Sequence, residues 1–301
     1  MTPAELARFV RQIEIKTRGL TSQVFSGEYH AAFKGRGMSF SEVRGYQPGD
    51  DVRDIDWNVT ARTGAPHVKI FEEERELSVL LVIDLTASMR FGTRGQSKRR
   101  LATELAAVLG SSALQNNDKV GAVLYGHADQ GAVGGEAARP FYIPPKKGFQ
   151  HVLRIVRELG GLPEGGGGAD LGATLRFVDN VTRRRAIVFA VSDFLGQGDY
   201  LTPLRVAARR HDLVGLRLAD RYEAELPDVG LLPVRDLETG ARALVDTSDA
   251  RTRRRHARHY AAERAAAEQA FRAAGAQLLE LTCGEDYVGR LLAFFKSRHK
   301  R

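Results

Sequence analysis

Short apolar runs alternate with amphipathic stretches from residue 77 onward. Three runs are apolar at nearly every position, as strands covered on both faces are, and they span 77–83, 119–125 and 186–191. Further strands are expected over 139–143, 213–218 and 276–282. The stretches with helical spacing are 97–114, 148–159, 170–182, 201–211 and 286–297. This alternation predicts an α/β fold in three layers, with helices on both faces of a doubly wound, mostly parallel sheet.

The N-terminal quarter of the chain has a different pattern. Apolar positions at helical spacing predict a helix over 3–18. Residues 26–66 are rich in Gly, Asp and Arg, and they predict a loop-rich segment with short extended pieces that covers one side of the core. We therefore divide the chain into an N-terminal extension, residues 1–76, which packs on the main domain, residues 77–301.

Two features interrupt the regular alternation near the C-terminus. The short strands 232–236 and 242–246 flank a turn that ends in Gly240, which predicts an inserted β-hairpin. A long helix is expected over 248–274, and six of its residues between 251 and 264 are Arg. This helix is either a site for nucleic acid or an acidic partner, or a solvated helix face, which is the interpretation we prefer.

The composition is that of a soluble globular protein. Of the 301 residues, 43% are hydrophobic and 27% are charged, and the net charge of +8 raises the chance of an anionic partner. The single cysteine excludes an internal disulfide, and the N-terminal segment lacks the apolar core of a secretion signal. With no apolar run long enough to span a membrane, we expect a cytoplasmic protein.

Polar side chains follow two of the apolar runs, where a doubly wound sheet binds its ligands. Asp84, Thr86 and Ser88 alternate along one turn after the run 77–83, and Asp193 follows the run 186–191. Such a turn can aim three oxygens at one point, and hard cations such as Mg²⁺ take oxygen ligands. A partner's carboxylate could complete the coordination. Alternatively, the turn is a helix N-cap without a metal.

Several other candidates have simpler interpretations. The Gly run 165–168 lacks the Lys of a P-loop and is expected to be a connector that lets Asp170 reach the site. The acidic string that begins at Asp50 lacks the spacing of a calcium loop, so a paired surface or a docking patch is expected. Trp57 is expected to anchor the core, and Cys283 to be a small core residue.

His256 and His259 have no partners at the spacing of a zinc site, so we expect them on the surface. We find no nucleophile with an adjacent base, and we therefore expect a protein that is not an enzyme.

The strand-end residues resemble the metal-ion-dependent adhesion site of von Willebrand factor A-like domains. The first element is Asp84-x-Thr86-x-Ser88, with Thr in place of the usual Ser, and the last element is Asp193. The middle element departs from the pattern, since Ala169 precedes Asp170 where the family has Thr. The resemblance implies a site for Mg²⁺ or Mn²⁺ with Asp84, Thr86, Ser88, Asp170 and Asp193 as ligands.

The flanking sequence resembles one branch of that group, the MoxR-associated proteins catalogued as domain of unknown function number 58. The segments that carry this resemblance are 29–37, 44–57, 61–62, 69–74 and 88–92. It implies a non-enzymatic adaptor that works with a MoxR-type AAA+ ATPase in the assembly or maturation of a client protein. The candidate partner contacts are Arg53, Asp54, Trp57 and Arg90.

Other functions are open at this point. The carboxylates of Asp84 and Asp193 could serve a metal-dependent hydrolase or nuclease, which an assay with labelled DNA or RNA and Mg²⁺ would detect. The basic surface could bind nucleic acid without cleaving it, which predicts a steep loss of affinity with salt. The domain could also bind partners through rigid loops without any metal.

Overall fold

The computed structural model describes residues 26–33, 38–73, 77–127, 139–162, 170–196, 198–237 and 240–299. The helix predicted over 3–18 and the Gly run with Ala169 lie outside these ranges, so they stay predictions.

A six-stranded sheet forms the centre of the molecule, in the order β10-β7-β6-β3-β4-β5. The first five strands pair in parallel, and β5 pairs antiparallel to β4 at the edge. The prediction of a mostly parallel sheet is therefore confirmed. The strands are β3 (Ser78–Asp84), β4 (Lys119–Tyr125), β5 (Phe141–Lys146), β6 (Ile187–Ser192), β7 (Asp212–Ala219) and β10 (Gln277–Thr282).

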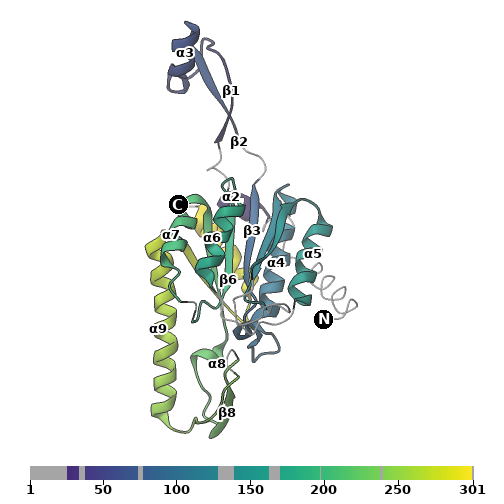
Figure 1. The fold of residues 1–301 in the computed structure, drawn as a ribbon, viewed down its shortest axis with the longest axis vertical. Coiled ribbons are helices and arrows are strands. Elements are labelled where there is room, and N and C mark those ends of the chain that lie inside the picture. The colour runs from purple at the N-terminus through teal and green to yellow at the C-terminus, as the bar shows by residue number, and fades with distance from the viewer. Residues whose placement is uncertain are drawn as a thin grey trace.

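Helices cover both faces of this sheet, which gives the three layers seen in Figure 1. One face is covered by α2 (Ser26–Phe33), α4 (Lys98–Gln115), α5 (Phe149–Gly161) and α10 (Tyr287–His299). The other face is covered by α6 (Leu171–Val181), α7 (Leu201–Arg210) and α9 (Ala250–Ala274). Along β3, Val79, Leu81 and Ile83 belong to the first core, whereas Leu80 and Val82 belong to the second. The alternation of side chains along a strand thus explains why this run is apolar throughout.

Helix α2 contributes to the core of the α/β body, although it precedes β3 by many residues. Tyr29 and Phe33 are buried, and the ring of Phe33 lies 5.6 Å from the rings of both Phe189 and Phe295. The guanidinium of Arg298 lies 4.5 Å from the centre of the Phe33 ring. Aromatic packing therefore ties this part of the N-terminal extension to the sheet and to α10.

Residues 38–73, which we call the arm, extend away from the body at the end of the sheet where β3 begins (Figure 1). The arm contains the antiparallel strands β1 (Met38–Gly45) and β2 (His67–Glu73). The turn η2 (Val52–Asp54) and helix α3 (Trp57–Thr63) lie between them. Of the segment 26–66 that is expected to cover one side of the core, α2 does so, whereas the arm does not.

The acidic residues that suggested loops order the tip of the arm instead. The carboxylate of Asp56 accepts hydrogen bonds from the backbone N–H groups at the start of α3, and Asp51 does the same for η2. Asp50 pairs with Arg44 at 2.7 Å. The paired acidic surface predicted here is confirmed, but the loop-rich interpretation is wrong because Asp51 and Asp56 cap short helical turns.

Trp57 does not anchor the core, and that prediction is wrong. Its side chain is 67% exposed at the first position of α3. The physical reason is its place on the arm, because a two-stranded sheet with one short helix has no second layer to cover an indole ring.

An insertion follows β7 at the carboxyl ends of the strands. It consists of the short helix α8 (Arg221–Ala224) and the antiparallel pair β8 (Leu231–Arg235) and β9 (Arg242–Asp246), which confirms the predicted hairpin. The 25-residue helix α9 leads from this insertion back over the sheet (Figure 1). In the part of the chain that the structure describes, none of the helices has both the length and the hydropathy needed to cross a bilayer.

The packing of α2 leads to a stability prediction. We expect Phe33→Ala to lower the free energy of unfolding by about 3–5 kcal/mol, because it leaves a cavity between α2, β6 and α10. Val52→Ala on the arm, where the side chain is 60% exposed, is expected to change it by at most about 0.5 kcal/mol. Urea denaturation of both variants measures the difference, and an unchanged midpoint for Phe33→Ala would show that α2 is not part of the core.

Candidate functional site

Three buried aspartates gather at the carboxyl ends of neighbouring strands. Asp84 ends β3, Asp193 follows β6, and Asp220 follows β7, and each is at most 1% exposed. The chain runs from β3 outward to β4 and β5, and then returns to place β6 on the other side of β3. Asp84 and Asp193 therefore lie at the topological switch point, where open α/β sheets bind their ligands.

Asp84 is held by two hydrogen bonds from different elements. Its Oδ2 accepts from the hydroxyl of Ser192 at 2.6 Å, and its Oδ1 accepts from the backbone N–H of Thr86 at 2.8 Å. Burial, and then the negative charge of Asp193, raise the pKa of Asp84 to about 6, although these hydrogen bonds oppose the shift. A positive charge placed beside Asp84 would therefore stabilise the ionised form of its carboxyl group.

The hydroxyls of Thr86 and Ser88 lie side by side after β3. Their oxygens are 3.0 Å apart, at the start of the short 3₁₀ turn η3 (Ala87–Arg90). Thr86 is pressed against Gly126, which has a φ of +73°, and a Cβ at that glycine would come within 2.6 Å of the Thr86 methyl group. Glycine after β4 is thus a condition for this turn, because any larger side chain would displace Thr86.

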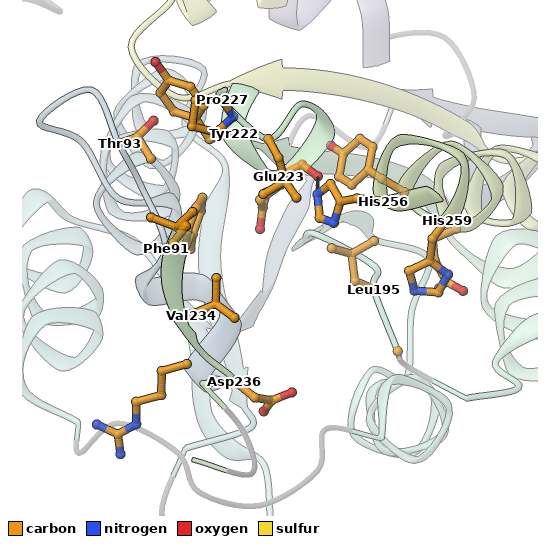
Figure 2. A pocket seen from close by; sticks show the side chains of 16 residues that line it. Phe91, Thr93, Leu195, Tyr222, Glu223, Pro227, Val234, Asp236, His256 and His259 are labelled. Carbon is orange, nitrogen blue, oxygen red and sulfur yellow. Dashed lines mark hydrogen bonds between the residues drawn. The ribbon is translucent and has the colours of Figure 1, made fainter. Parts of the chain in front are cut away.

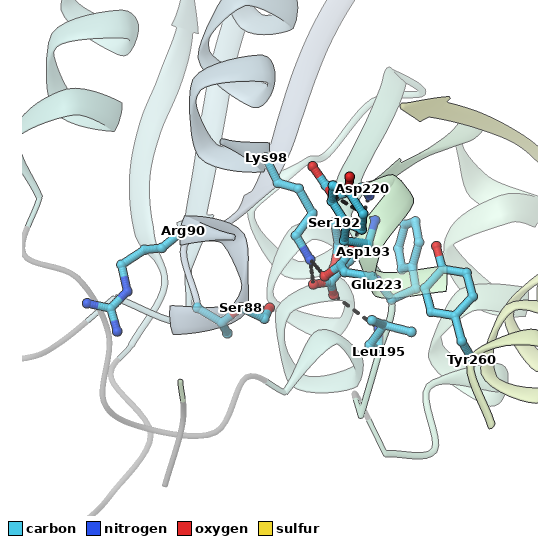
Figure 3. Close-up of polar contacts among 12 residues, drawn as sticks. Ser88, Arg90, Lys98, Ser192, Asp193, Leu195, Asp220, Glu223 and Tyr260 are labelled. Carbon is cyan, nitrogen blue, oxygen red and sulfur yellow. Dashed lines mark hydrogen bonds and ion pairs between the residues drawn. The ribbon is translucent and has the colours of Figure 1, made fainter. Parts of the chain in front are cut away.

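Lys98 is fully buried at the first position of α4 and points toward two carboxylates (Figure 3). Its Nζ donates to Asp193 at 2.6 Å and also to Glu223. Burial alone lowers the pKa of Lys98, but the two carboxylates outweigh it and hold the pKa above its usual value. Burial raises the pKa of Glu223, against the effect of Lys98. The protein therefore supplies one cation of its own to this acidic cluster.

Asp220 and Glu223 hold the insertion against the loop before α4. They form a capping box at α8, and Asp220 also accepts from the hydroxyl of Thr93 at 2.7 Å and from its backbone N–H at 2.9 Å. Through Glu223, the same short helix reaches Lys98. The site therefore connects α4, β6 and the insertion.

The residues present fit a hard divalent cation at the hydroxyl pair. Adjacent oxygens around octahedral Mg²⁺ lie about 3.0 Å apart, since each is about 2.1 Å from the ion, and the Thr86 and Ser88 oxygens, 3.0 Å apart, have this spacing. Asp84 supplies a nearby buried charge, whereas Asp193 is already bound to Lys98. Within the described ranges, no group of three or more His, Cys, Asp or Glu side chains is arranged to hold a metal.

The remaining predicted site residues are all exposed. Asp170 is exposed at the start of α6, where it accepts from the backbone N–H of Ala173 at 2.7 Å and lies 3.8 Å from Arg176. Arg90 is exposed at the end of η3 and points away from the acidic cluster (Figure 3). The other candidate partner contacts, Arg53, Asp54 and Trp57, lie on the arm.

Sequence reasoning missed three residues of the cluster. Asp220 could have been found, because it follows an apolar strand in the same way as Asp84 and Asp193. Lys98 and Glu223 carry no such signal, since a lysine or glutamate in the first turns of a helix ordinarily faces solvent.

A cavity of about 840 Å³ lies beside the cluster, between η3, the insertion and α9 (Figure 2). Glu223 forms part of its wall. His256 and His259, expected on the surface, also line it, and His256 Nε2 is 2.7 Å from the backbone oxygen of Glu223. The apolar and aromatic part of the lining comprises Phe91, Leu195, Tyr222, Leu226, Pro227, Leu232, Val234 and Tyr260.

The fold and the site define an α/β domain with a buried acidic cluster at its switch point. A family model described as "Protein of unknown function DUF58" matches residues 42–266, and the chain belongs to this family. The uncharacterized protein Rv1480 of Mycobacterium tuberculosis is 34% identical over 298 residues, which cover 98% of this chain and 90% of that protein. The uncharacterized protein MAV169 of Mycobacterium avium is 31% identical over 160 residues, which cover 52% and 94%.

Solved structures that match the chain include the conserved hypothetical protein BatB from Bacteroides thetaiotaomicron. Its TM-score is 0.44 at 14% identity, over 75% of this chain and 100% of that chain. An aerotolerance-related membrane protein from Bacteroides fragilis has a TM-score of 0.43 at 13% identity, over 74% and 98%.

The buried lysine leads to a second stability prediction. Lys98→Met keeps the length of the side chain but leaves Asp193 and Glu223 buried without a cation, so we expect a loss of about 3–5 kcal/mol in the free energy of unfolding. Lys296→Met on the exposed face of α10 is the matched control, with an expected change within about 0.5 kcal/mol. Urea denaturation at neutral pH would contradict this account if the two variants unfolded at the same midpoint.

The chemistry of the single cysteine gives a third prediction. Cys283 is 1% exposed, as predicted for a small core residue, and burial, followed by the charge of Asp220, raises the pKa of its thiol to about 12. At pH 8 the native protein should therefore react very slowly with a thiol reagent, whereas urea-unfolded protein, with a thiol pKa near 8.5, should react at the rate of a free cysteine. Rapid labelling of the native protein would show that this region opens.

Proposed function

We propose that the chain is a protein-binding adaptor with a metal-ion-dependent adhesion-type site on a von Willebrand factor A-like domain. The observation that carries this proposal is the Thr86–Ser88 hydroxyl pair at 3.0 Å, next to a buried Asp84 at the switch point of the sheet. An excess of buried carboxylate over ammonium at these strand ends favours the uptake of a divalent cation.

In this proposal, Thr86 and Ser88 hold Mg²⁺ or Mn²⁺ through their hydroxyls, and Asp84 balances its charge. Asp193, which is ion-paired with Lys98, adds negative charge beside the metal. Asp170 becomes a ligand only if the N-terminus of α6 brings its carboxylate to the site. When bound, the metal would act as a Lewis acid to which a carboxylate oxygen of a partner coordinates. The protein's part is to hold the two hydroxyls at the spacing of a coordination edge and to exclude water from Asp84.

Binding is favoured over catalysis by the way these groups are paired. The Thr86 and Ser88 hydroxyls bond to each other, and Lys98 is bound to two carboxylates, so none of the three is set up as an activated nucleophile or base. The proposed partner is a MoxR-type AAA+ ATPase together with a client protein, and this part rests on the family resemblance. Arg53, Asp54, Trp57 and Arg90 are exposed and therefore available to such a partner.

Calorimetric titration of Mg²⁺ and Mn²⁺ into chelator-treated protein tests the site. We expect saturable binding by the wild type and a loss of about tenfold or more in affinity for Ser88→Ala, because one oxygen of the coordination edge is removed. Ser297→Ala, at the far end of α10, is the matched control and should bind as the wild type does. Equal affinity in Ser88→Ala and wild type would place any metal elsewhere.

A pull-down with a purified MoxR-type ATPase tests the partner. Capture by the wild type should require Mg²⁺ or Mn²⁺, disappear in chelator and fail for Ser88→Ala, while Ser297→Ala behaves as the wild type. Capture that persists unchanged in chelator would instead support a metal-free binding domain. Cleavage of labelled RNA or DNA that Ser88→Ala abolishes would support the hydrolase alternative.

A further inference from the structure

Exposed arginines gather where α6, α7 and α9 end, at the amino ends of β6, β7 and β10. Three of them follow α6 in the turn before β6, three lie on α7, and one lies in the last turn of α9. We call this set the arginine patch, and all of its members are exposed: Arg183, Arg184, Arg185, Arg205, Arg209, Arg210 and Arg272. Such a concentration of one sign of charge makes a strongly positive surface.

Hydrogen bonds between these elements show that the arginines are neighbours. The guanidinium of Arg210 donates to the backbone oxygens of Asp179 and Thr182 at 2.6 and 2.8 Å, which ties the end of α7 to the turn after α6. The Nε of Arg205 donates to the backbone oxygen of Ala273 at 3.4 Å, which ties α7 to the end of α9. The patch is therefore continuous across three elements that are separate in the sequence.

Acidic groups beside the patch are held by other cations or lie on one side of it. Asp179 lies 3.3 Å from the buried ring of His211, and Asp212 accepts two hydrogen bonds from Arg298. The glutamates at 72–73 end β2 just before β3, the neighbour of β6, so the positive surface extends over α7 and α9. The ends of three helices add about −1.5 charges in total, which is far less than the seven positive charges of the arginines.

The chemistry of the patch fits the phosphates of a nucleic acid. A guanidinium group is always charged, and its planar fork of N–H donors matches two oxygens of one phosphate. A nucleic acid carries a regular row of phosphates, which arginines on adjacent elements can contact together. Contacts of this kind position a protein on the backbone and carry no information about the base sequence.

The shape of the molecule argues against an anionic membrane at this end. The arm extends past the amino ends of the strands (Figure 1), and its residues 38–73 include seven acidic and four basic residues, a net charge of −3. A flat bilayer across this end would meet the acidic arm as well as the patch, whereas a nucleic acid can lie against α7 and α9. Val206, which is 51% exposed on α7, is a small apolar group to insert into a bilayer.

We propose that the arginine patch binds the phosphate backbone of a nucleic acid, independently of its base sequence. The patch lies at the amino ends of the strands, and the Thr86–Ser88 hydroxyl pair lies at the carboxyl ends. This binding therefore goes beyond the proposed metal site and does not rest on it. One molecule can hold a nucleic acid at one end of its sheet and a protein partner at the other.

Fluorescence anisotropy with a labelled DNA duplex of about 20 base pairs tests the patch, with EDTA present so that no divalent metal takes part. We expect saturable binding by the wild type at about 50 mM salt and a steep loss of affinity by about 200 mM. Arg183→Glu combined with Arg185→Glu should lower the affinity about tenfold. It should also reduce the slope of log affinity against log salt by about 2, because two phosphate contacts are lost. A duplex of unrelated sequence should bind equally well.

Arg254→Glu combined with Arg255→Glu is the matched control, because it makes the same change in net charge at two exposed arginines. These residues lie about 25 Å along α9 from Arg272, beyond the Debye length of about 10 Å, so this variant should bind as the wild type does. Arg209→Glu combined with Arg272→Glu, which takes one arginine from each of two other elements, should weaken binding as much as the first pair. It also keeps the test decisive if the first pair fails to fold.

Three results would overturn the proposal. They are a wild type that does not bind the duplex at low salt, an equal loss of affinity in the control pair, and binding of polyglutamate or of phosphatidylglycerol vesicles in place of DNA. Ser88→Ala should bind the duplex as the wild type does, so failure of this proposal is distinguishable from failure of the metal site.

Discussion

The burial of Lys98 between two carboxylates is the interaction on which the structure at the carboxyl ends of the strands depends. An ammonium group can be taken out of water only where its charge is matched, and here the match comes from the end of β6 and from α8. Three elements that are distant in the sequence therefore have to meet at one atom. The positions of the loop before α4, the insertion and the cavity all follow from that requirement, because Glu223 belongs to the cluster and to the cavity wall.

The same cluster separates what could be predicted from what could not. The apolar runs predicted β3, β4 and β6 within about one residue, and the rule that ligands lie beyond strand ends selected Asp84 and Asp193. These predictions succeed because they depend on the local pattern and on general topology. Lys98 and Glu223 were missed because their burial depends on each other, and nothing local distinguishes them from surface residues.

The sequence of the arm is misleading for a related reason. Its carboxylates and glycines are typical of loops, yet Asp51 and Asp56 cap short helical turns. The usual preference of a tryptophan ring predicts burial of Trp57, but a residue can be buried only if a second layer lies over it. The composition of a segment thus indicates which groups are polar, and only the tertiary arrangement decides whether they cap, pair or face water.

Helix α9 has two halves with different surroundings. Ala267 and Phe271, in its C-terminal half, are buried against the sheet, whereas His256 and Tyr260, in its N-terminal half, border the cavity. The position of the N-terminal half therefore depends on the angle at which the helix is held at Phe271. From Phe271 to the start of the helix is about 32 Å at 1.5 Å per residue, so a tilt of about 5° moves that end by about 3 Å. The width of the cavity is consequently coupled to the packing of one phenylalanine ring near the other end of the same helix.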